Sequence, residues 1–251
     1  MTRDLLSIGL AQFGSVAGDF EANLARHLVV IESAASAGVT LLVFPELSLI
    51  GYEPALVAEL AFAPEDPRLV PLVDAAVRHR VGIVVGLPLA GVERPRAGAL
   101  IVSPNGEVST YAKRHLHPGE EAVFEPGTEY CLLDFNNERV AIAICADTNA
   151  PEHAEQYAEL GATVYLAGVL ITAGGYAADT EQMAQTAERH GMLVGMANHN
   201  AVSGGMAAIG KSGFWTAKGV LAAADERDAL VIATRQSDGW HGQLHLLALT
   251  D

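Results

Sequence analysis

The chain has 251 residues, half of them hydrophobic, and its 30 acidic against 15 basic side chains give a formal net charge of −15. The apolar fraction excludes intrinsic disorder, and the length predicts a single domain over residues 1–251. A strongly negative chain repels phosphate backbones and anionic lipids, so we expect no nucleic-acid and no membrane partner. No run of about 18 apolar residues is available to span a bilayer, and the opening MTRDLLSIGLAQFG does not resemble a signal peptide, so a cytoplasmic location is expected.

Short apolar segments rich in Val, Ile and Leu alternate with helical patterns along the chain. Several of them, such as LLVF and GIVVG, are continuously apolar, which predicts strands covered on both faces. The predicted strands are Leu5–Phe13, Leu41–Pro45, Gly82–Leu87, Ala99–Ser103, Val108–Lys113, Cys131–Phe135, Arg139–Cys145, Thr163–Ala167, Leu193–Ala197, Ser212–Thr216, Val220–Ala223 and Ala229–Thr234. The predicted helices begin near Asp19, Asp66, Pro151 and Asp179. This alternation predicts an α/β fold with a mixed sheet, or two sheets, covered by helices.

The two cysteines are predicted to be free thiols. The segment around residues 136–137 has the pattern of a hairpin, in which Cys131 faces Ile142. Cys145 then lies roughly 10 Å further along the strand and on the other face of the sheet. A disulfide between the two would require the strands to move, and a chain of this size does not need one.

Residues Gly205–Ser212 match the phosphate-binding pattern G-x-x-x-x-G-K-[ST]. That loop requires a strand before it and a helix after it, because its amides and the helix N-terminus hold the phosphates. Here Phe214 favours a strand, and a turn at Lys218-Gly219 leaves no room for a useful helix. A glycine-rich connection into a hairpin is the favoured interpretation, and a P-loop nucleotide-binding protein is the alternative.

Three polar side chains stand at the ends of predicted strands. Glu46 follows LLVF, Lys113 ends VSTYAK and Cys145 follows VAIAI. Ligand sites of open α/β sheets lie beyond the carboxyl ends of strands, so the three groups can meet at one site. The trio suits nucleophilic acyl transfer, in which the carboxylate takes the thiol proton and a protonated lysine stabilises both the thiolate and the oxyanion. The structural alternatives are a core thiol, a capping or solvated acid and a lysine that reaches out to solvent.

The chain resembles the nitrilase superfamily, the carbon–nitrogen hydrolases, in three blocks. These are FPELSLIGY (44–52), YAKRHL with EEAVFEPG (111–127) and AIAICADTNAPEHA (141–154). The order and spacing of Glu, Lys and Cys match, and IGLAQF near the start and IGKSGFW near the end extend the resemblance over nearly the whole chain. The resemblance implies a four-layer α-β-β-α sandwich, and it reassigns the phosphate-loop look-alike to a structural strand.

Carried over residue by residue, the resemblance implies Glu46 as general base, Lys113 as oxyanion stabiliser and Cys145 as nucleophile. The backbone amide of Ala146 would be the second oxyanion donor. The family often has a further glutamate ahead of its Phe-x-Pro-Gly turn, which positions the substrate and the lysine. The offset from that turn at residues 124–127 selects Glu120 as this auxiliary catalytic residue, and the neighbouring Glu121 is the alternative.

The resemblance implies an amidase-like hydrolase of non-peptide C–N bonds that needs no cofactor and no metal. Its substrate would be a small linear amide or N-carbamoyl amine, which Cys145 would convert to a thioester with release of ammonia or an amine. A nitrilase acting on a small nitrile is one alternative, and a non-catalytic binding member of the fold is another. Members commonly dimerise through the helices beside the cysteine block, so a homodimer or higher homo-oligomer is expected. The residues after the cysteine differ from the family's more frequent run, so the sequence leaves the substrate open.

Overall fold

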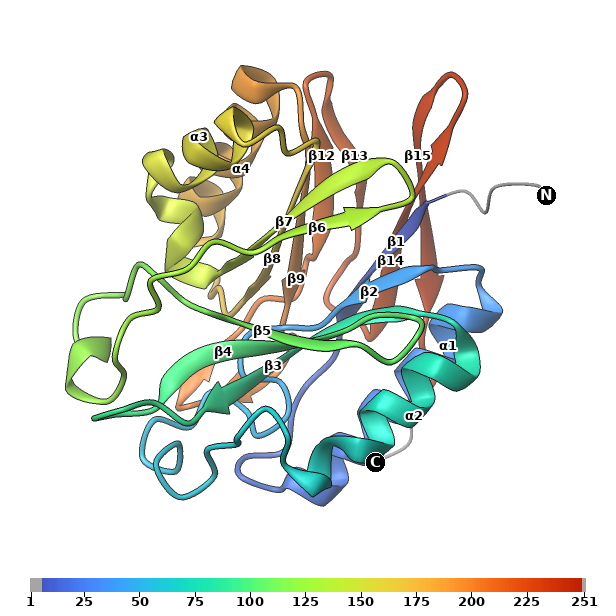
Figure 1. Ribbon diagram of the computed structural model, residues 1–251. Helices are drawn as coiled ribbons and strands as arrows, with labels where there is room; N and C mark the ends of the chain where they lie inside the picture. The colour runs from blue at the N-terminus through green and yellow to red at the C-terminus, as the bar shows by residue number, and fades with distance from the viewer. Residues whose placement is uncertain (1–5, 250–251) are drawn as a thin grey trace.

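The computed structural model describes residues 6–249 and contains two β-sheets that face each other, as Figure 1 shows. Two helices cover the outer side of each sheet. The helices are α1 (Phe20–Ser36) and α2 (Val70–His79) on the first sheet, and α3 (Pro151–Glu159) and α4 (Tyr176–His190) on the second. This arrangement is the four-layer α-β-β-α sandwich that the sequence predicts.

The first sheet has the strand order β15-β14-β1-β2-β3-β4-β5. Its strands are β1 (Ser7–Gln12), β2 (Leu41–Val43), β3 (Gly82–Leu89), β4 (Arg96–Val102), β5 (Val108–Ala112), β14 (Ala229–Gln236) and β15 (Gly239–Leu246). The three central strands β1, β2 and β3 are parallel, and the outer pairs are antiparallel. Leu5, the first residue of the predicted opening strand, lies outside the described residues.

The second sheet has the strand order β13-β12-β9-β8-β7-β6. Its strands are β6 (Leu132–Phe135), β7 (Glu138–Ile144), β8 (Val164–Val169), β9 (Leu193–Asn198), β12 (Gly213–Thr216) and β13 (Gly219–Ala223). Strands β7, β8 and β9 are parallel. A separate two-stranded hairpin joins β10 (Val202–Ser203) to β11 (Met206–Ala207).

Apolar side chains fill three layers of this sandwich. The middle layer lies between the two sheets and contains Leu10, Val43 and Ile142, each at most 1% exposed. The outer layers lie under α1 and α2 on one side and under α3 and α4 on the other. The continuously apolar strands therefore pack on both faces, which explains why their sequences do not alternate.

Three short 3₁₀ turns connect these elements: Pro67–Leu69, Glu120–Ala122 and Cys145–Asn149. The first of them splits the helix predicted from Asp66, and α2 follows it. Pro71 has no backbone N–H to donate to Pro67, so the α-helical pattern cannot extend back through this turn.

Helix α4 begins before the predicted position at Asp179. The residue ahead of the helix is Gly175, and the Tyr176 hydroxyl donates to the Lys211 carbonyl oxygen at 3.1 Å. This contact anchors the first turn, so the helix starts at Tyr176 and Asp179 lies inside it.

Strand β15 is absent from the sequence prediction. Its residues are mostly exposed, and it pairs on one side with β14, from Ala229↔Leu246 to Gln236↔Gly239. An edge strand with little buried apolar surface carries little hydrophobic pattern, so the sequence does not reveal it.

The predicted hairpin between β6 and β7 is confirmed in its register. Leu132 pairs with Ala141, and the Ile142 amide donates to the Cys131 carbonyl oxygen at 3.2 Å. Cys131 and Cys145 are both free thiols, as predicted. None of the helices within residues 6–249 has the length and apolar character needed to cross a membrane.

Candidate active site

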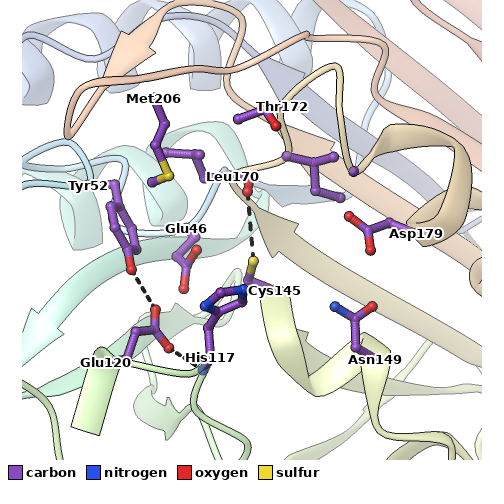
Figure 2. Close-up of a pocket in the computed structure, with 12 residues that line it drawn as sticks. Glu46, Tyr52, His117, Glu120, Cys145, Asn149, Leu170, Thr172, Asp179 and Met206 are labelled. Atoms are coloured by element: carbon purple, nitrogen blue, oxygen red, sulfur yellow. Dashed lines mark hydrogen bonds between the residues drawn. The ribbon is translucent and has the colours of Figure 1, made fainter.

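The structure brings Glu46, Lys113, Glu120 and Cys145 together at one end of the facing sheets. Glu46 lies shortly after β2, Lys113 directly follows β5 and Cys145 directly follows β7. All except the lysine line a cavity of about 280 Å³ (Figure 2). The other lining residues are Tyr52, His117, Asn149, Leu170, Ile171, Thr172, Gly175, Asp179 and Met206. Strand-end placement thus produces the convergence that the sequence predicts.

Two glycines allow the backbone before Glu46 to pass between the sheets. A Cβ atom on Gly86 of β3 would lie 2.2 Å from the Pro45 carbonyl oxygen. A Cβ atom on Gly168 of β8 would lie 2.5 Å from the Phe44 carbonyl oxygen. Both distances are below van der Waals contact, so a side chain at either position would displace the segment that carries Glu46.

Lys113 lies between the two buried glutamates of the site, Glu46 and Glu120. Its Nζ donates to Glu46 Oε1 at 2.8 Å and to the Glu120 carboxylate at 2.8–2.9 Å. The lysine is 1% exposed, and the two glutamates are 2% and 7% exposed. Charges removed from water to this extent require partners, and each of the three has one.

Two further donors hold Glu120. The Tyr52 hydroxyl donates to its Oε1 at 2.7 Å, and the His117 backbone N–H donates to its Oε2 at 2.7 Å. The predicted choice of Glu120 over Glu121 agrees with this geometry, because Glu121 is exposed and accepts from the Gly119 backbone N–H.

The two carboxylates on Lys113 have pKa values displaced in opposite directions. Burial raises the pKa of Glu46, and this outweighs the opposing attraction of Lys113. Burial also acts on Glu120, but Lys113, Tyr52 and the His117 amide together lower its pKa. Burial disfavours the charged form of Lys113, yet the surrounding negative charges, Glu46 first, raise its pKa above the ordinary value. The site therefore contains a carboxylate suited to accept a proton, a carboxylate held ionised and a lysine held protonated.

Cys145 occupies a strained turn at the end of β7. Its φ of 43° lies in the left-handed region, which a residue with a side chain seldom adopts. The Asp147 carboxylate holds this turn by accepting from the Ile144 backbone N–H at 3.0 Å. Its other oxygen accepts from the backbone N–H groups of Arg114 and His115 at 3.0 and 2.9 Å. Asp147 thus ties the cysteine turn to the segment after Lys113.

The Cys145 thiol lines the cavity, and its Sγ lies 3.9 Å from the Leu170 carbonyl oxygen. Burial and the charge of Glu46 raise the pKa of this thiol, although Lys113 acts in the opposite direction. The lysine therefore favours the thiolate, as the sequence analysis expects, but burial and Glu46 act more strongly on the pKa. A raised pKa favours the neutral thiol, and the nearby Glu46 Oε2 has no hydrogen-bond partner among residues 6–249.

Tyr52 and Asp179 line the cavity but carry no role in the sequence analysis. Tyr52 closes the block FPELSLIGY, so its place in that block was the available signal. Asp179 lies far along the chain from Cys145. Its sequence context indicated only that an acidic residue is favourable in the first turn of a helix.

The phosphate-loop look-alike is built as a strand connection. Strand β12 begins directly after Ser212, and no helix starts there. Four backbone N–H groups in the second half of the pattern are already bonded within the protein: Ile209 to Ile171 O, Gly210 to His199 O, Lys211 to Asp225 O and Ser212 to Gln12 Oε1. These four amides are therefore not free to hold a phosphate.

The part of the chain that the structure describes, residues 6–249, shows no group of three or more His, Cys, Asp or Glu side chains arranged to hold a metal ion. His115 and His117, which follow Lys113 in the sequence, belong to no such group. His241 Nε2 instead lies 2.8 Å from Asp238 Oδ1 at an exposed position.

Residues 7–241 match the carbon-nitrogen hydrolase family, and the chain belongs to this family. It is 34% identical over 171 residues to an (R)-stereoselective amidase from a Pseudomonas species, across 67% of this chain and 60% of that protein. It is 33% identical to a nitrilase from Pyrococcus abyssi, across 57% of this chain and 56% of that protein. With a glutamine-dependent NAD(+) synthetase from Thermotoga maritima it shares 30% identity, across 64% of this chain and 29% of that protein. The alignments thus span less than two thirds of these relatives.

The fold is that of a solved amidase from Nesterenkonia sp. AN1, with a TM-score of 0.85 and 24% sequence identity. The match covers 93% of this chain and 92% of that one, and the neighbour carries the acetamide moiety of fluoroacetamide on its active-site cysteine. Another structure of that amidase, in complex with butyramide, matches with a TM-score of 0.84. These likenesses establish the four-layer architecture.

Proposed function

We propose that this chain hydrolyses the C–N bond of small linear amides or N-carbamoyl amines, with Cys145 as nucleophile, Glu46 as general base and Lys113 as oxyanion stabiliser. The observation that carries the proposal is a buried lysine held between two glutamates that line one cavity together with a cysteine. The amidase among its relatives supports the same reaction class.

The first half of the reaction forms a thioester. The Cys145 sulfur attacks the amide carbonyl carbon while its proton moves to the unpartnered oxygen of Glu46. The oxyanion that develops is stabilised by the Lys113 ammonium and the backbone N–H of Ala146. The proton on Glu46 then passes to the leaving nitrogen, the C–N bond breaks and ammonia or an amine departs.

The second half hydrolyses the thioester. Glu46 takes a proton from water as the water oxygen attacks the thioester carbon, and Lys113 again stabilises the oxyanion. The C–S bond breaks, the acid product leaves and the proton returns from Glu46 to the sulfur. Glu120 keeps its charge throughout and, as a positioning residue, holds Lys113 at 2.8–2.9 Å.

A panel of small amides, N-carbamoyl amines and nitriles, assayed for ammonia release, tests this proposal. We expect release from at least one amide or carbamoyl amine and loss of that activity in Cys145→Ala. Cys131→Ala is the matched control, because Cys131 precedes β6, does not line the cavity and should keep turnover. Activity confined to nitriles would instead favour the nitrilase alternative.

The single domain over residues 1–251, the homo-oligomeric state and the cytoplasmic location stay predictions. Light scattering coupled to size-exclusion chromatography tests the oligomer directly. A mass equal to one chain of 26.3 kDa would contradict it.

A further inference from the structure

The reaction cavity contains a third carboxylate, Asp179, which the proposed chemistry does not use. Figure 2 shows Asp179 on the opposite side of Cys145 from Glu46 and Glu120. Asp179 belongs to the first turn of α4, and its Oδ2 would lie 3.1 Å from a Cβ atom on Gly175. The absence of a side chain on Gly175 therefore leaves space for this carboxylate at the cavity wall.

The charge of Asp179 is not paired with a lysine or arginine within residues 6–249. No Lys or Arg in this part of the chain forms a salt bridge with it, and no Lys or Arg is among the residues that line the cavity. Lys113, buried beneath the cavity, is shared by Glu46 and Glu120. Asn149 and His117, which also line the cavity, lie near Asp179 and favour its ionised form. Burial raises the pKa of Asp179, as expected for a carboxylate partly removed from water without a fixed cation.

A second observation indicates that the cavity is built to hold a ligand. Glu46 Oε2 is buried and lacks a hydrogen-bond partner among the described residues, although Glu46 lines the cavity. Figure 2 shows Cys145 between Glu46 on one side and Asp179 on the other, so a substrate whose amide is at Cys145 can extend along the cavity toward Asp179. The far end of a linear substrate then approaches a carboxylate, which accepts hydrogen bonds and attracts positive charge.

We propose that Asp179 is a specificity-determining residue that selects linear amides whose acyl chain ends in a protonated amine. The inference rests on the proposed function and names its substrate class. The ammonium group supplies the countercharge that the cavity lacks and donates to the Asp179 carboxylate. An acyl chain ending in a carboxylate meets repulsion from Asp179 and from the chain's net charge of −15.

The test compares cationic amides with neutral amides of the same shape. β-Alaninamide is paired with butanamide, γ-aminobutyramide with pentanamide, and succinamate serves as the anionic analogue. For the better-fitting pair, kcat/KM of the cationic amide should exceed that of the neutral amide by about tenfold. This factor corresponds to the lower end of the range of energies for a hydrogen bond to a charged group, because Asp179 is partly exposed. Succinamate should be the poorest substrate of the set.

Two variants assign the preference to the residue. Asp179→Asn keeps the shape and removes the charge, so the ratio of cationic to neutral kcat/KM should fall by about tenfold. Glu181→Gln is the matched control, because Glu181 is exposed on the same helix and should leave the ratio unchanged. Calorimetric binding to Cys145→Ala, with and without Asp179→Asn, gives the same comparison without turnover.

The outcomes separate this inference from the proposed function. Ammonia release with equal kcat/KM for each cationic and neutral pair overturns the role of Asp179 and leaves amide hydrolysis standing. An unchanged ratio in Asp179→Asn does the same. Absence of ammonia from every amide tested overturns both.

Discussion

Lys113 Nζ lies 2.8 Å from Glu46 Oε1, and both side chains are almost completely buried between the sheets. The two residues come from the ends of β5 and β2, which are separated in the first sheet by β3 and β4. The contact therefore depends on the loops that leave these strands and not on strand pairing. It places a proton acceptor and a fixed positive charge at one cavity beside Cys145.

Glu46→Gln tests the general base. The amide side chain keeps the shape and still accepts from Lys113, but it cannot take the thiol proton. We expect kcat to fall by about 10²-fold or more, since general-base assistance contributes 10²–10⁴-fold. Thermal unfolding should show a folded chain, and an unchanged kcat would contradict the role of Glu46.

Lys113→Met tests the central cation. It removes the partner of two buried carboxylates, and breaking a buried pair costs about 3–5 kcal/mol. We expect both loss of activity and a large decrease in the free energy of unfolding, measured with urea. Lys218→Met is the control, because Lys218 is exposed in the turn between β12 and β13 and should change neither.

Three buried histidines predict acid sensitivity. Burial lowers the pKa of His27, His153 and His199 from 6.5 to about 4. The unfolded chain binds these protons at higher pH than the native chain does, so stability is fully present above pH 6.5 and is lost as pH falls toward 4. Each histidine contributes a slope of about 1.4 kcal/mol per pH unit within that window.

The variant His27→Gln isolates one of the three contributions. His27 Nδ1 lies 2.7 Å from the Asn23 carbonyl oxygen and Nε2 lies 2.9 Å from Ser48 Oγ, and Gln retains some capacity for such bonds. Urea unfolding between pH 4 and 6.5, the interval between the lowered and the ordinary pKa, should show that the free energy of unfolding depends less steeply on pH in the variant. Equal slopes in variant and wild type would show that His27 does not titrate as inferred.

Nucleotides should leave the melting temperature unchanged. The amides of the loop at residues 209–212 are bonded within the protein, and β12 follows the loop where a P-loop has a helix. A ligand at 100 times its Kd would stabilise the native chain by about 2.7 kcal/mol, which a thermal scan detects. A clear rise with ATP or GTP would restore the nucleotide-binding alternative.

Much of this site could be predicted because it consists of strand ends. Glu46 and Cys145 follow runs whose apolar residues mark them as buried strands, and Lys113 follows the edge strand β5, whose pattern VSTYA favours a strand; the ends of parallel strands lie on one side. The hairpin of β6 and β7 was predictable for a similar reason, since its turn at residues 136–137 sets the pairing.

The remaining parts depend on tertiary contacts that leave no periodic pattern. Tyr52 lies in an irregular segment, and its bond to Glu120 becomes visible only when residues far apart in the chain meet. The raised pKa of the Cys145 thiol follows from its burial beside Glu46, which the sequence does not show. Asp179 carries a signal of helix capping alone, although it lines the cavity.

Mass spectrometry of enzyme quenched during turnover of an amide tests the central claim most directly. The account predicts an acyl adduct on the peptide that contains Cys145, and neither adduct nor turnover in Cys145→Ala. Cys131, whose pKa burial raises to about 12, should stay unmodified. Full turnover by Cys145→Ala, or an acyl group on Cys131 in its place, would contradict the assignment of the nucleophile and the mechanism built on it.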